Sequence, residues 1–282
     1  MVILVTGATG TVGRCVVEQL VSAGAKVRAL TRRPDSAAMP PSVEVVAGDL
    51  EKPESLTRVF AGVDRMYLLA AGATWQVLSR ARQADVRQVV LLSSATAGFD
   101  GVGSDGDLGG QFHRRAEREV EGSGLEWTHL RPGMFASNLL DWAEAIRIEA
   151  VVKAPYDAAR QSPVHELDIA AVATTALLSD GHQGKIYTLT GPEALTKTEQ
   201  VAAIAGAIRR DIRFEELAPE QWREHVRDAM PPFVADWLLR LWAHTMTTPE
   251  PVLPTVQRIL GRPPRTLATW AADHAAHFQA AP

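Results

Sequence analysis

The sequence predicts an α/β fold in which a doubly wound parallel sheet carries a smaller, mostly helical C-terminal lobe. Short apolar segments of strand length alternate with amphipathic stretches of helical period along the first half of the chain. Such alternation is typical of a parallel sheet covered by helices on both faces. A glycine-rich turn directly follows the first apolar segment, whereas the chain after about residue 190 is helical, aromatic and punctuated by prolines. We therefore expect a sheet domain over residues 1–150 and a lobe over residues 151–282, parts of which return to the sheet domain.

The first apolar run, Val2–Val5, has the composition of a strand buried on both faces. Apolar residues then recur with helical spacing from Val12 to Val21, so a strand, a glycine turn and a helix open the chain. The crossovers between later strands are expected to be right-handed. Further strands are predicted over residues 26–31, 43–47, 65–70, 88–92 and 127–130, and helices over residues 53–60, 75–84 and 110–122.

Two later regions break this alternation. Six glycines and three aspartates fall between Gly98 and Gly110, a composition that predicts a mobile loop, which we interpret as a lid. The second region is the aromatic C-terminal part, whose alanine-rich last helix is expected to begin near Thr266. Before it, Asp168 stands where the N-cap of a helix over residues 169–177 would lie.

The composition describes an ordinary globular protein and limits its partners. Hydrophobic residues make up 46% and charged residues 22% of the 282 residues, enough for one large core. The formal net charge of -4 gives no general attraction to nucleic acid or anionic lipid. The single cysteine, Cys15, allows neither an internal disulfide nor a thiolate zinc cluster, and the histidines show no metal-binding spacing. No apolar run reaches membrane length, so we expect a cytoplasmic protein without a metal; the sequence leaves open whether it forms a homodimer.

The turn over residues 7–13, GATGTVG, stands where a dinucleotide-binding fold places its phosphate loop. Gly7 allows a tight turn, Gly10 lets backbone N–H groups approach a pyrophosphate, and Gly13 lets helix and strand pack closely. The spacing is G-x-x-G-x-x-G rather than G-x-G-x-x-G, and a glycine turn that binds nothing is the alternative. The predicted contacts to the dinucleotide come from Gly7, Thr9, Gly10, Thr11, Val12 and Gly13.

The residues after the second predicted strand favour NADP(H) over NAD(H), which stays open as the second choice. An NAD site usually places an acidic residue there for the ribose hydroxyl, but this chain has Arg32 and Arg33, whose guanidiniums can pair with a 2′-phosphate. Surface arginines of a loop are the alternative. Asp49 and Leu50, after the third strand, either contact the adenine or begin the next helix. Three residues after the fourth strand complete the expected cofactor contacts: Ala70, Ala71 and Gly72.

Several short motifs occur in a fixed order along the chain. GATGTVG is followed by TRR at residues 31–33, GDL at 48–50, LSS at 92–94 and LRP at 130–132. In this order, and in late stretches over residues 163–170 and 261–266, the chain resembles the NmrA-like group of atypical short-chain dehydrogenase/reductases. The resemblance covers nearly the whole sequence. It implies an NAD(P)-binding Rossmann domain over residues 1–150 and a substrate-binding lobe over residues 151–282.

The chain departs from the broader superfamily at its catalytic pair. The superfamily's Tyr-x-x-x-Lys motif falls on His113 to Glu117 here, and the serine site falls on Ser93 or Ser94. His113 is the candidate acid, since an imidazole titrates near neutrality, and Glu117 four residues later shares its helix face and can hold it charged. A routine surface pair and ordinary strand-end serines are the alternatives. The chain has three tyrosines, none of them on that helix: Tyr67, Tyr156 and Tyr187.

The missing tyrosine limits the reduction that the resemblance implies. Hydride reduction of an isolated ketone creates a strongly basic alkoxide, so a positioned acid contributes about 10²–10⁴-fold to the rate. In a quinone or an extended aromatic system the charge spreads onto oxygens of phenol-like basicity, with a pKa of about 10. The sequence therefore favours a flat, conjugated acceptor.

The expected substrate contacts fit such an acceptor. Met134, Phe135 and Asn138 come where the family's chain passes the nicotinamide, and tryptophans of the lobe offer wide aromatic faces, Trp222 and Trp237 first among them. Packing within the core is the alternative for each. The leading hypothesis is an NAD(P)H-dependent oxidoreductase that transfers hydride to a quinone-like or polycyclic aromatic small molecule, with aromatic polyketide tailoring as its setting. The alternatives are a redox-sensing regulatory protein that binds the dinucleotide without turnover, and a cofactor-stabilised scaffold.

Overall fold

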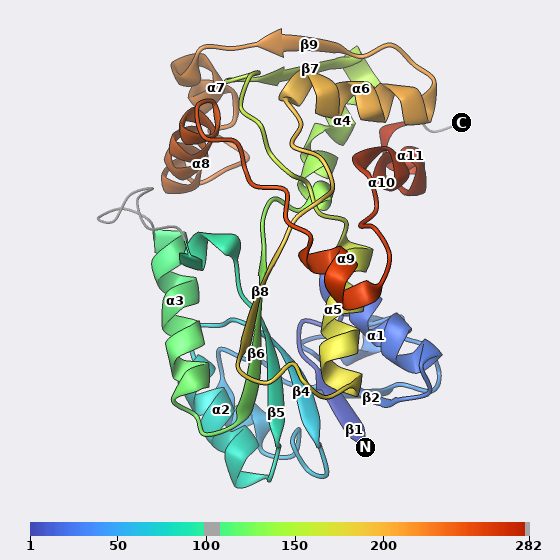
Figure 1. Cartoon of the computed structure of the whole chain (residues 1–282), viewed down its shortest axis with the longest axis vertical. Coiled ribbons are helices and arrows are strands. Elements are labelled where there is room, and N and C mark those ends of the chain that lie inside the picture. Colours follow the sequence, from blue (N-terminus) through green and yellow to red (C-terminus); the bar gives the residue numbers. More distant parts are fainter. Residues whose placement is uncertain (99–107, 280–282) are drawn as a thin grey trace.

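A parallel sheet with helices on both faces forms one end of the molecule, and a mostly helical lobe lies beyond the carboxyl ends of its strands (Figure 1). The computed structural model describes residues 1–98 and 108–279. Most of the predicted mobile loop, residues 99–107, lies outside the described residues, so its mobility and its role as a lid stay predictions.

The sheet has seven parallel strands in the order β3-β2-β1-β4-β5-β6-β8. The chain runs outward from β1 to β3 and then returns to the other side of β1, so the strand order reverses between β1 and β4. In open α/β sheets such a switch point creates the crevice where ligands bind. The strands are β1 (Val2–Val5), β2 (Lys26–Thr31), β3 (Glu44–Ala47), β4 (Arg65–Leu69), β5 (Gln88–Leu92), β6 (Glu126–Pro132) and β8 (Lys185–Leu189).

Two apolar layers cover the sheet, because side chains of a buried strand alternate between its faces. Ile3 and Val5 point to the layer that contains α1 (Thr11–Ser22) and α5 (Glu166–Leu178). Leu4 points to the layer that contains α2 (Thr74–Gln83) and α3 (Leu108–Glu121). The predicted doubly wound fold is therefore confirmed.

The lobe contains a two-stranded parallel sheet, β7 (Val151–Ala154) with β9 (Arg213–Glu216), which the sequence analysis missed. Its own core forms around Trp270, which is fully buried together with Phe278 and Ile204. The helices of the lobe are α4 (Ala143–Glu149), α6 (Lys197–Ile208), α7 (Pro219–His225), α8 (Pro232–Thr245), α10 (Leu267–Asp273) and α11 (Ala275–Phe278), while α9 (Thr255–Leu260) packs on α5.

The prediction of a helix over residues 53–60 is wrong. Only a 3-10 turn, η2 (Pro53–Leu56), forms there, and its N-cap residue Lys52 makes no side-chain cap bond. The apolar residues that suggested the helix, Leu56, Val59 and Phe60, are nevertheless buried beneath the sheet. The division of the chain at residue 150 stays a prediction, with α5 and β8 as later elements that join the sheet domain.

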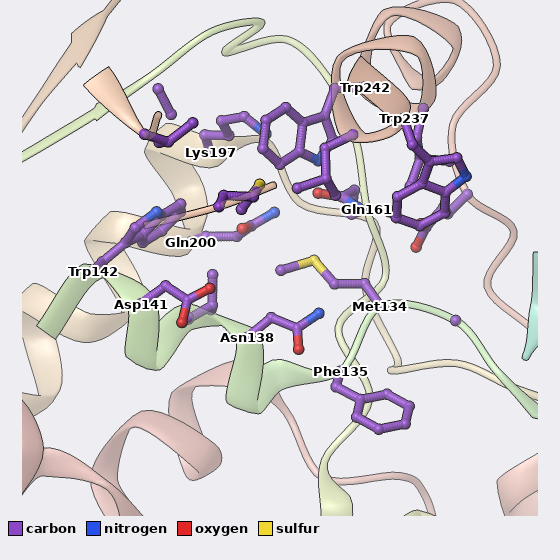
Figure 2. Close-up of a pocket in the computed structure, with 18 of the residues that line it drawn as sticks. Met134, Phe135, Asn138, Asp141, Trp142, Gln161, Lys197, Gln200, Trp237 and Trp242 are labelled. Carbon is purple, nitrogen blue, oxygen red and sulfur yellow. Dashed lines mark hydrogen bonds between the residues drawn. The ribbon is translucent and has the colours of Figure 1, made fainter. Parts of the chain in front are cut away.

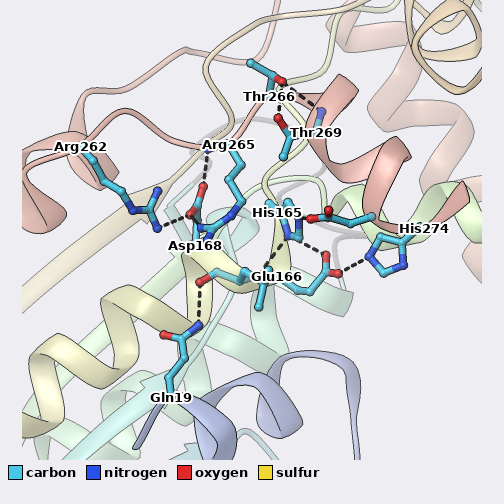
Figure 3. A network of polar contacts seen from close by, with 11 residues as sticks. Gln19, His165, Glu166, Asp168, Arg262, Arg265, Thr266, Thr269 and His274 are labelled. Atoms are coloured by element: carbon cyan, nitrogen blue, oxygen red, sulfur yellow. Dashed lines mark hydrogen bonds and ion pairs between the residues drawn. The ribbon is translucent and has the colours of Figure 1, made fainter. Parts of the chain in front are cut away.

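The N-terminus of α5 is tied to the last part of the chain through a polar network (Figure 3). The predicted N-cap, Asp168, lies inside the helix, and the cap is His165, whose Nδ1 accepts from the Leu167 amide. Asp168 is fully buried and accepts from the Arg262 guanidinium at 2.7 Å, from the Arg265 amide at 2.6 Å and from the Arg265 guanidinium. The GRPPRT stretch thus fixes the C-terminal helices against the sheet domain.

Candidate active site

The glycine turn between β1 and α1 has the close contacts that its sequence predicts. Gly7 has φ +59°, in the left-handed region that favours glycine. A Cβ added to Gly13 would lie 2.1 Å from the carbonyl oxygen of Gly7, so a side chain there would force the turn away from α1. The amide of Gly10 donates to the same carbonyl at 2.9 Å.

The first turn of α1 fits a bound pyrophosphate. The helix begins at Thr11 with Gly10 as its N-cap, so no side chain caps it, and its first turn carries no acidic residue. The N–H groups at a helix start lack partners within the helix, and the helix dipole favours an anion there. Thr9 and Thr11 are exposed beside these groups, while Val12 is buried and offers only its backbone.

The expected adenosine contacts surround the carboxyl ends of β2 and β3. Arg32 and Arg33 are exposed directly after β2. Arg14 of α1 donates to the carbonyl oxygens of Ala37 and Ala38, at 3.1 and 3.0 Å, and so holds the segment after these arginines.

Asp49 makes a local hydrogen bond after β3, and its contact with the adenine stays a prediction. Its carboxylate accepts from the Glu51 amide at 3.1 Å, closing a local turn with Leu50 between them. After β4, the Ala71 amide donates to Thr74 and the Gly72 amide donates to Glu51, so neither amide is a free donor for the dinucleotide. Ala70 is half-buried next to them.

A cavity of about 590 Å³ lies where the carboxyl ends of the strands meet the lobe. Its walls are mainly apolar, and Figure 2 shows Met134 and Gln200 pointing toward each other across part of it. None of the three tyrosines lines it. The lining brings together most of the residues predicted for catalysis and substrate binding: Ser93, Ser94, His113, Met134, Phe135, Asn138, Trp222 and Trp237.

Glu117 has different partners from those expected. It is 3% exposed, and its carboxylate accepts from the Ser93 hydroxyl at 2.6 Å and from the Arg131 guanidinium at 2.8 and 2.7 Å. Burial raises the pKa of this carboxyl, but the hydrogen bonds from Arg131 and Ser93 outweigh it and hold the pKa below its usual range. The surface-pair alternative is therefore wrong for Glu117, which lies outside the cavity lining and supports Ser93 from behind.

The two serines differ in how their hydroxyl groups are used. The Ser93 proton is donated to Glu117. The Ser94 oxygen instead accepts from the Thr96 amide at 3.2 Å and from the Thr96 hydroxyl at 2.9 Å, which leaves the Ser94 proton to point elsewhere. His113 is half-buried on α3 and faces the same cavity. Among the residues predicted for catalysis, Ser94 and His113 are thus the candidate hydrogen-bond donors at the cavity wall.

The cavity also contains polar residues that sequence reasoning missed, chiefly Lys197, Glu250, Gln161 and Gln200. Lys197 opens α6 behind its N-cap Thr196 and is 2% exposed, with its ammonium 4.0 Å from the ring centre of Trp242. The capping box Thr-x-x-Glu of α6 is readable in the sequence, but nothing in it shows that the lysine after the cap faces a cavity.

Comparisons with known proteins place the chain in a family. Residues 7–180 match the family described as NAD(P)H-binding. The chain belongs to this family. It is 39% identical to a (4-alkanoyl-5-oxo-2,5-dihydrofuran-3-yl)methyl phosphate reductase of Streptomyces griseus, over 98% of this chain and 99% of that protein. It is 35% identical to an NAD(P)H azoreductase of Xenophilus azovorans, over 99% of this chain and 100% of that protein.

Solved structures share the fold. The NADPH complex of the NADPH-dependent quinone oxidoreductase of Escherichia coli superposes with a TM-score of 0.81 at 23% identity, over 97% of this chain and 99% of that one. The negative transcriptional regulator NmrA, solved with NADP, gives a TM-score of 0.74 at 15% identity, over 96% of this chain and 94% of that one. The NAD(P)-binding family that the resemblance implies is therefore confirmed, and NmrA shares the fold.

Residues 1–98 and 108–279 contain neither a candidate membrane span nor a candidate metal cluster. No helix there has the length and apolar character needed to cross a bilayer. No group of three or more histidine, cysteine, aspartate or glutamate side chains in that part of the chain has a spacing that would hold a metal ion.

Proposed function

We propose that the protein is an NADPH-dependent reductase that transfers hydride to a quinone-like or polycyclic aromatic acceptor. The observation that carries the proposal is the cavity itself, which has apolar and aromatic walls, adjoins the nucleotide crevice, and contains no tyrosine. An acceptor that delocalises charge needs less help from an acid than an isolated ketone does.

When bound, the dinucleotide supplies the hydride, and the acceptor then takes up one proton to become the reduced product. The pyrophosphate fits the start of α1, and the exposed Arg32 and Arg33 fit a 2′-phosphate, which favours NADPH over NADH. Ser94 donates a hydrogen bond to the substrate oxygen that gains charge, and His113 supplies its proton. Glu117, which Arg131 holds, accepts from Ser93 and so fixes the residue after β5 beneath this oxygen.

The aromatic residues bind the acceptor ring. Trp222 and Trp237 come from α7 and α8 of the lobe, and Met134, Phe135 and Asn138 follow β6 of the sheet domain. A flat ring between these two walls contacts apolar surface on both faces. Two relatives above 30% identity are named for the reduction of an azo bond and of an alkanoyl dihydrofuranone phosphate, both conjugated groups, which agrees with this substrate class.

The proposal is tested by following the absorbance of NADPH with a panel of naphthoquinones and anthraquinones, and with cyclohexanone as the isolated ketone. We expect oxidation with the quinones and none with cyclohexanone. Absence of turnover with every acceptor, together with a strong calorimetric preference between oxidised and reduced cofactor, would favour the redox-sensing protein instead.

The donor roles are tested by Ser94→Ala and His113→Gln, with His244→Gln as a control because His244 is exposed on α8 and outside the cavity. Each of the two cavity variants is expected to lower kcat. The decrease should be smaller than the about 10²–10⁴-fold that a general acid contributes to reduction of an isolated ketone, because the acceptor oxygen is weakly basic. An unchanged kcat and pH profile for His113→Gln would remove His113 from proton transfer.

A further inference from the structure

Lys197 is a buried charge that lines the cavity and takes no part in the reaction described above. Its side chain is 2% exposed, and its ammonium contacts the face of Trp242. Among the residues that the structure describes, no hydrogen bond or ion pair of this ammonium is found. Burying a cation without hydrogen-bond partners is unfavourable unless another charge completes the site.

The nearest carboxylates are held by other groups. Asp157, Glu250 and Glu216 act on Lys197 electrostatically, but each accepts a backbone amide elsewhere. Asp157 accepts from Thr198 at 2.8 Å, Glu250 from Ser162 at 2.9 Å, and Glu216 from Asp157 at 3.0 Å. Burial outweighs their attraction and lowers the pKa of Lys197 to about 7. The ammonium therefore lacks a direct counter-ion.

The position of Lys197 on its helix adds to this. It is the first residue of α6, where the helix dipole is unfavourable to a cation, so neither its burial nor its place in the helix stabilises its charge. Burial, the lack of a direct counter-ion and the helix dipole all disfavour the charge of Lys197. A cation in such a place at the wall of a ligand cavity is a candidate for ligand recognition. An anionic group on the ligand would supply the missing partner.

The other charged groups of the cavity do not compete for this role. Glu149 pairs with Lys153 at 3.1 Å, and Glu250 is hydrogen-bonded to Ser162 and Gln161. Asp141 is exposed at the cavity wall. Of the two lysines that line the cavity, Lys153 is thus paired, whereas Lys197 contacts the Trp242 ring and makes no hydrogen bond or ion pair with the part of the chain that the structure describes.

We propose that Lys197 determines substrate specificity by binding an anionic substituent of the acceptor, a carboxylate or a phosphate monoester, at the lobe end of the cavity. The inference rests on the proposed function for its reaction. The substituent would displace no protein partner, and the Trp242 ring would hold the ammonium in place through its face. A hydrogen bond between opposite charges contributes about 1.5–3 kcal/mol, which corresponds to roughly 10–100-fold in affinity.

The test compares an anthraquinone carboxylate with the hydroxymethyl anthraquinone of the same shape. Binding is measured by calorimetry with NADP⁺ present, so that no hydride is available and no turnover occurs. The variants are Lys197→Met, which keeps the length of the side chain and removes its charge, and Lys197→Arg, which keeps the charge. Lys185→Met is the control, because Lys185 is exposed on β8.

We expect the wild-type protein to bind the carboxylate about 10-fold or more tighter than the alcohol. Lys197→Met should remove this preference without weakening the alcohol, Lys197→Arg should retain part of it, and Lys185→Met should leave it unchanged. Equal affinities in the wild-type protein, or a preference that survives Lys197→Met, would overturn the inference. If Lys197→Met does not fold, equal affinities of the wild-type protein for the two compounds would still overturn the inference. Lys197→Arg should then retain part of the wild-type preference for the carboxylate.

The failure of the proposed reaction is distinguishable from failure of this inference. NADPH oxidation by the neutral quinones, without tighter binding of the anthraquinone carboxylate, would refute the inference and support the reaction. A Lys197-dependent preference in binding, without NADPH oxidation by either compound, would support the inference and refute the reaction.

Discussion

Replacing Glu117 by glutamine tests the buried ion pair beneath the cavity. The carboxylate accepts three hydrogen bonds, one from Ser93 and two from Arg131. A glutamine has one acceptor oxygen. Its amide nitrogen is a donor, so one guanidinium N–H of Arg131 would meet another donor instead of an acceptor. The variant therefore loses the charge and at least one hydrogen bond, and leaves Arg131 with an incomplete partner.

The expected loss is large because the site is buried. Removing one partner of a buried ion pair costs about 3–5 kcal/mol, and the side chain of Arg131 keeps 19% exposure, so we expect the lower end, about 3 kcal/mol. At roughly 2–3 °C per kcal/mol for a chain of this size, Tm should fall by about 6–9 °C. Calorimetry and urea unfolding measure both quantities.

The control is Glu119→Gln on the same helix. Glu119 pairs with Arg115 at 2.8 Å, but the arginine side chain is 69% exposed, and such surface pairs contribute about 0.5 kcal/mol or less. The reasoning is refuted if Glu117→Gln unfolds within about 1 kcal/mol of the wild-type protein, or if the two variants lose equal stability.

Three further predictions concern the cofactor site and the polar network at the N-terminus of α5. Gly13→Ala should abolish NADPH binding in calorimetry and lower Tm, because its Cβ would lie 2.1 Å from the Gly7 carbonyl oxygen; normal binding would contradict the role of the turn. Replacing Arg32 and Arg33 by glutamine should weaken NADPH binding by about 10-fold or more and leave NADH binding unchanged, whereas equal effects on both cofactors would make them ordinary surface residues. Burial raises the pKa of Glu166, but its contacts with His165, with its own backbone amide and with His274 lower the pKa from 4.5 to about 2. Its contribution to stability is complete above pH 4.5 and is lost as the pH falls toward 2, so Glu166→Gln should flatten the acid unfolding profile in that window, and a profile identical to the wild-type one would show that the carboxylate is not stabilising.

The sequence by itself determined the features that depend on neighbours along the chain. The observed strands β2 and β5 have the predicted bounds, because a short apolar run between turn residues describes a strand buried in a parallel sheet. The same holds for Gly7 and Gly13, whose spacing alone brings helix and strand into contact. The missing catalytic tyrosine was also readable, since the identity of a residue needs no coordinates.

Only the tertiary structure decided which distant side chains meet. Glu117 lies four residues from His113 on one helix face, yet its hydrogen bonds reach across to β5 and to Arg131 on β6. The pairing of β7 with β9 joins segments about sixty residues apart, and their short runs carry no signal of their partner. Lys197 follows a helix cap like many surface lysines, and only the tertiary structure brings its ammonium against Trp242 of α8 in the wall of a cavity. Periodicity and turn chemistry act locally, whereas burial and charge pairing depend on how the whole chain packs.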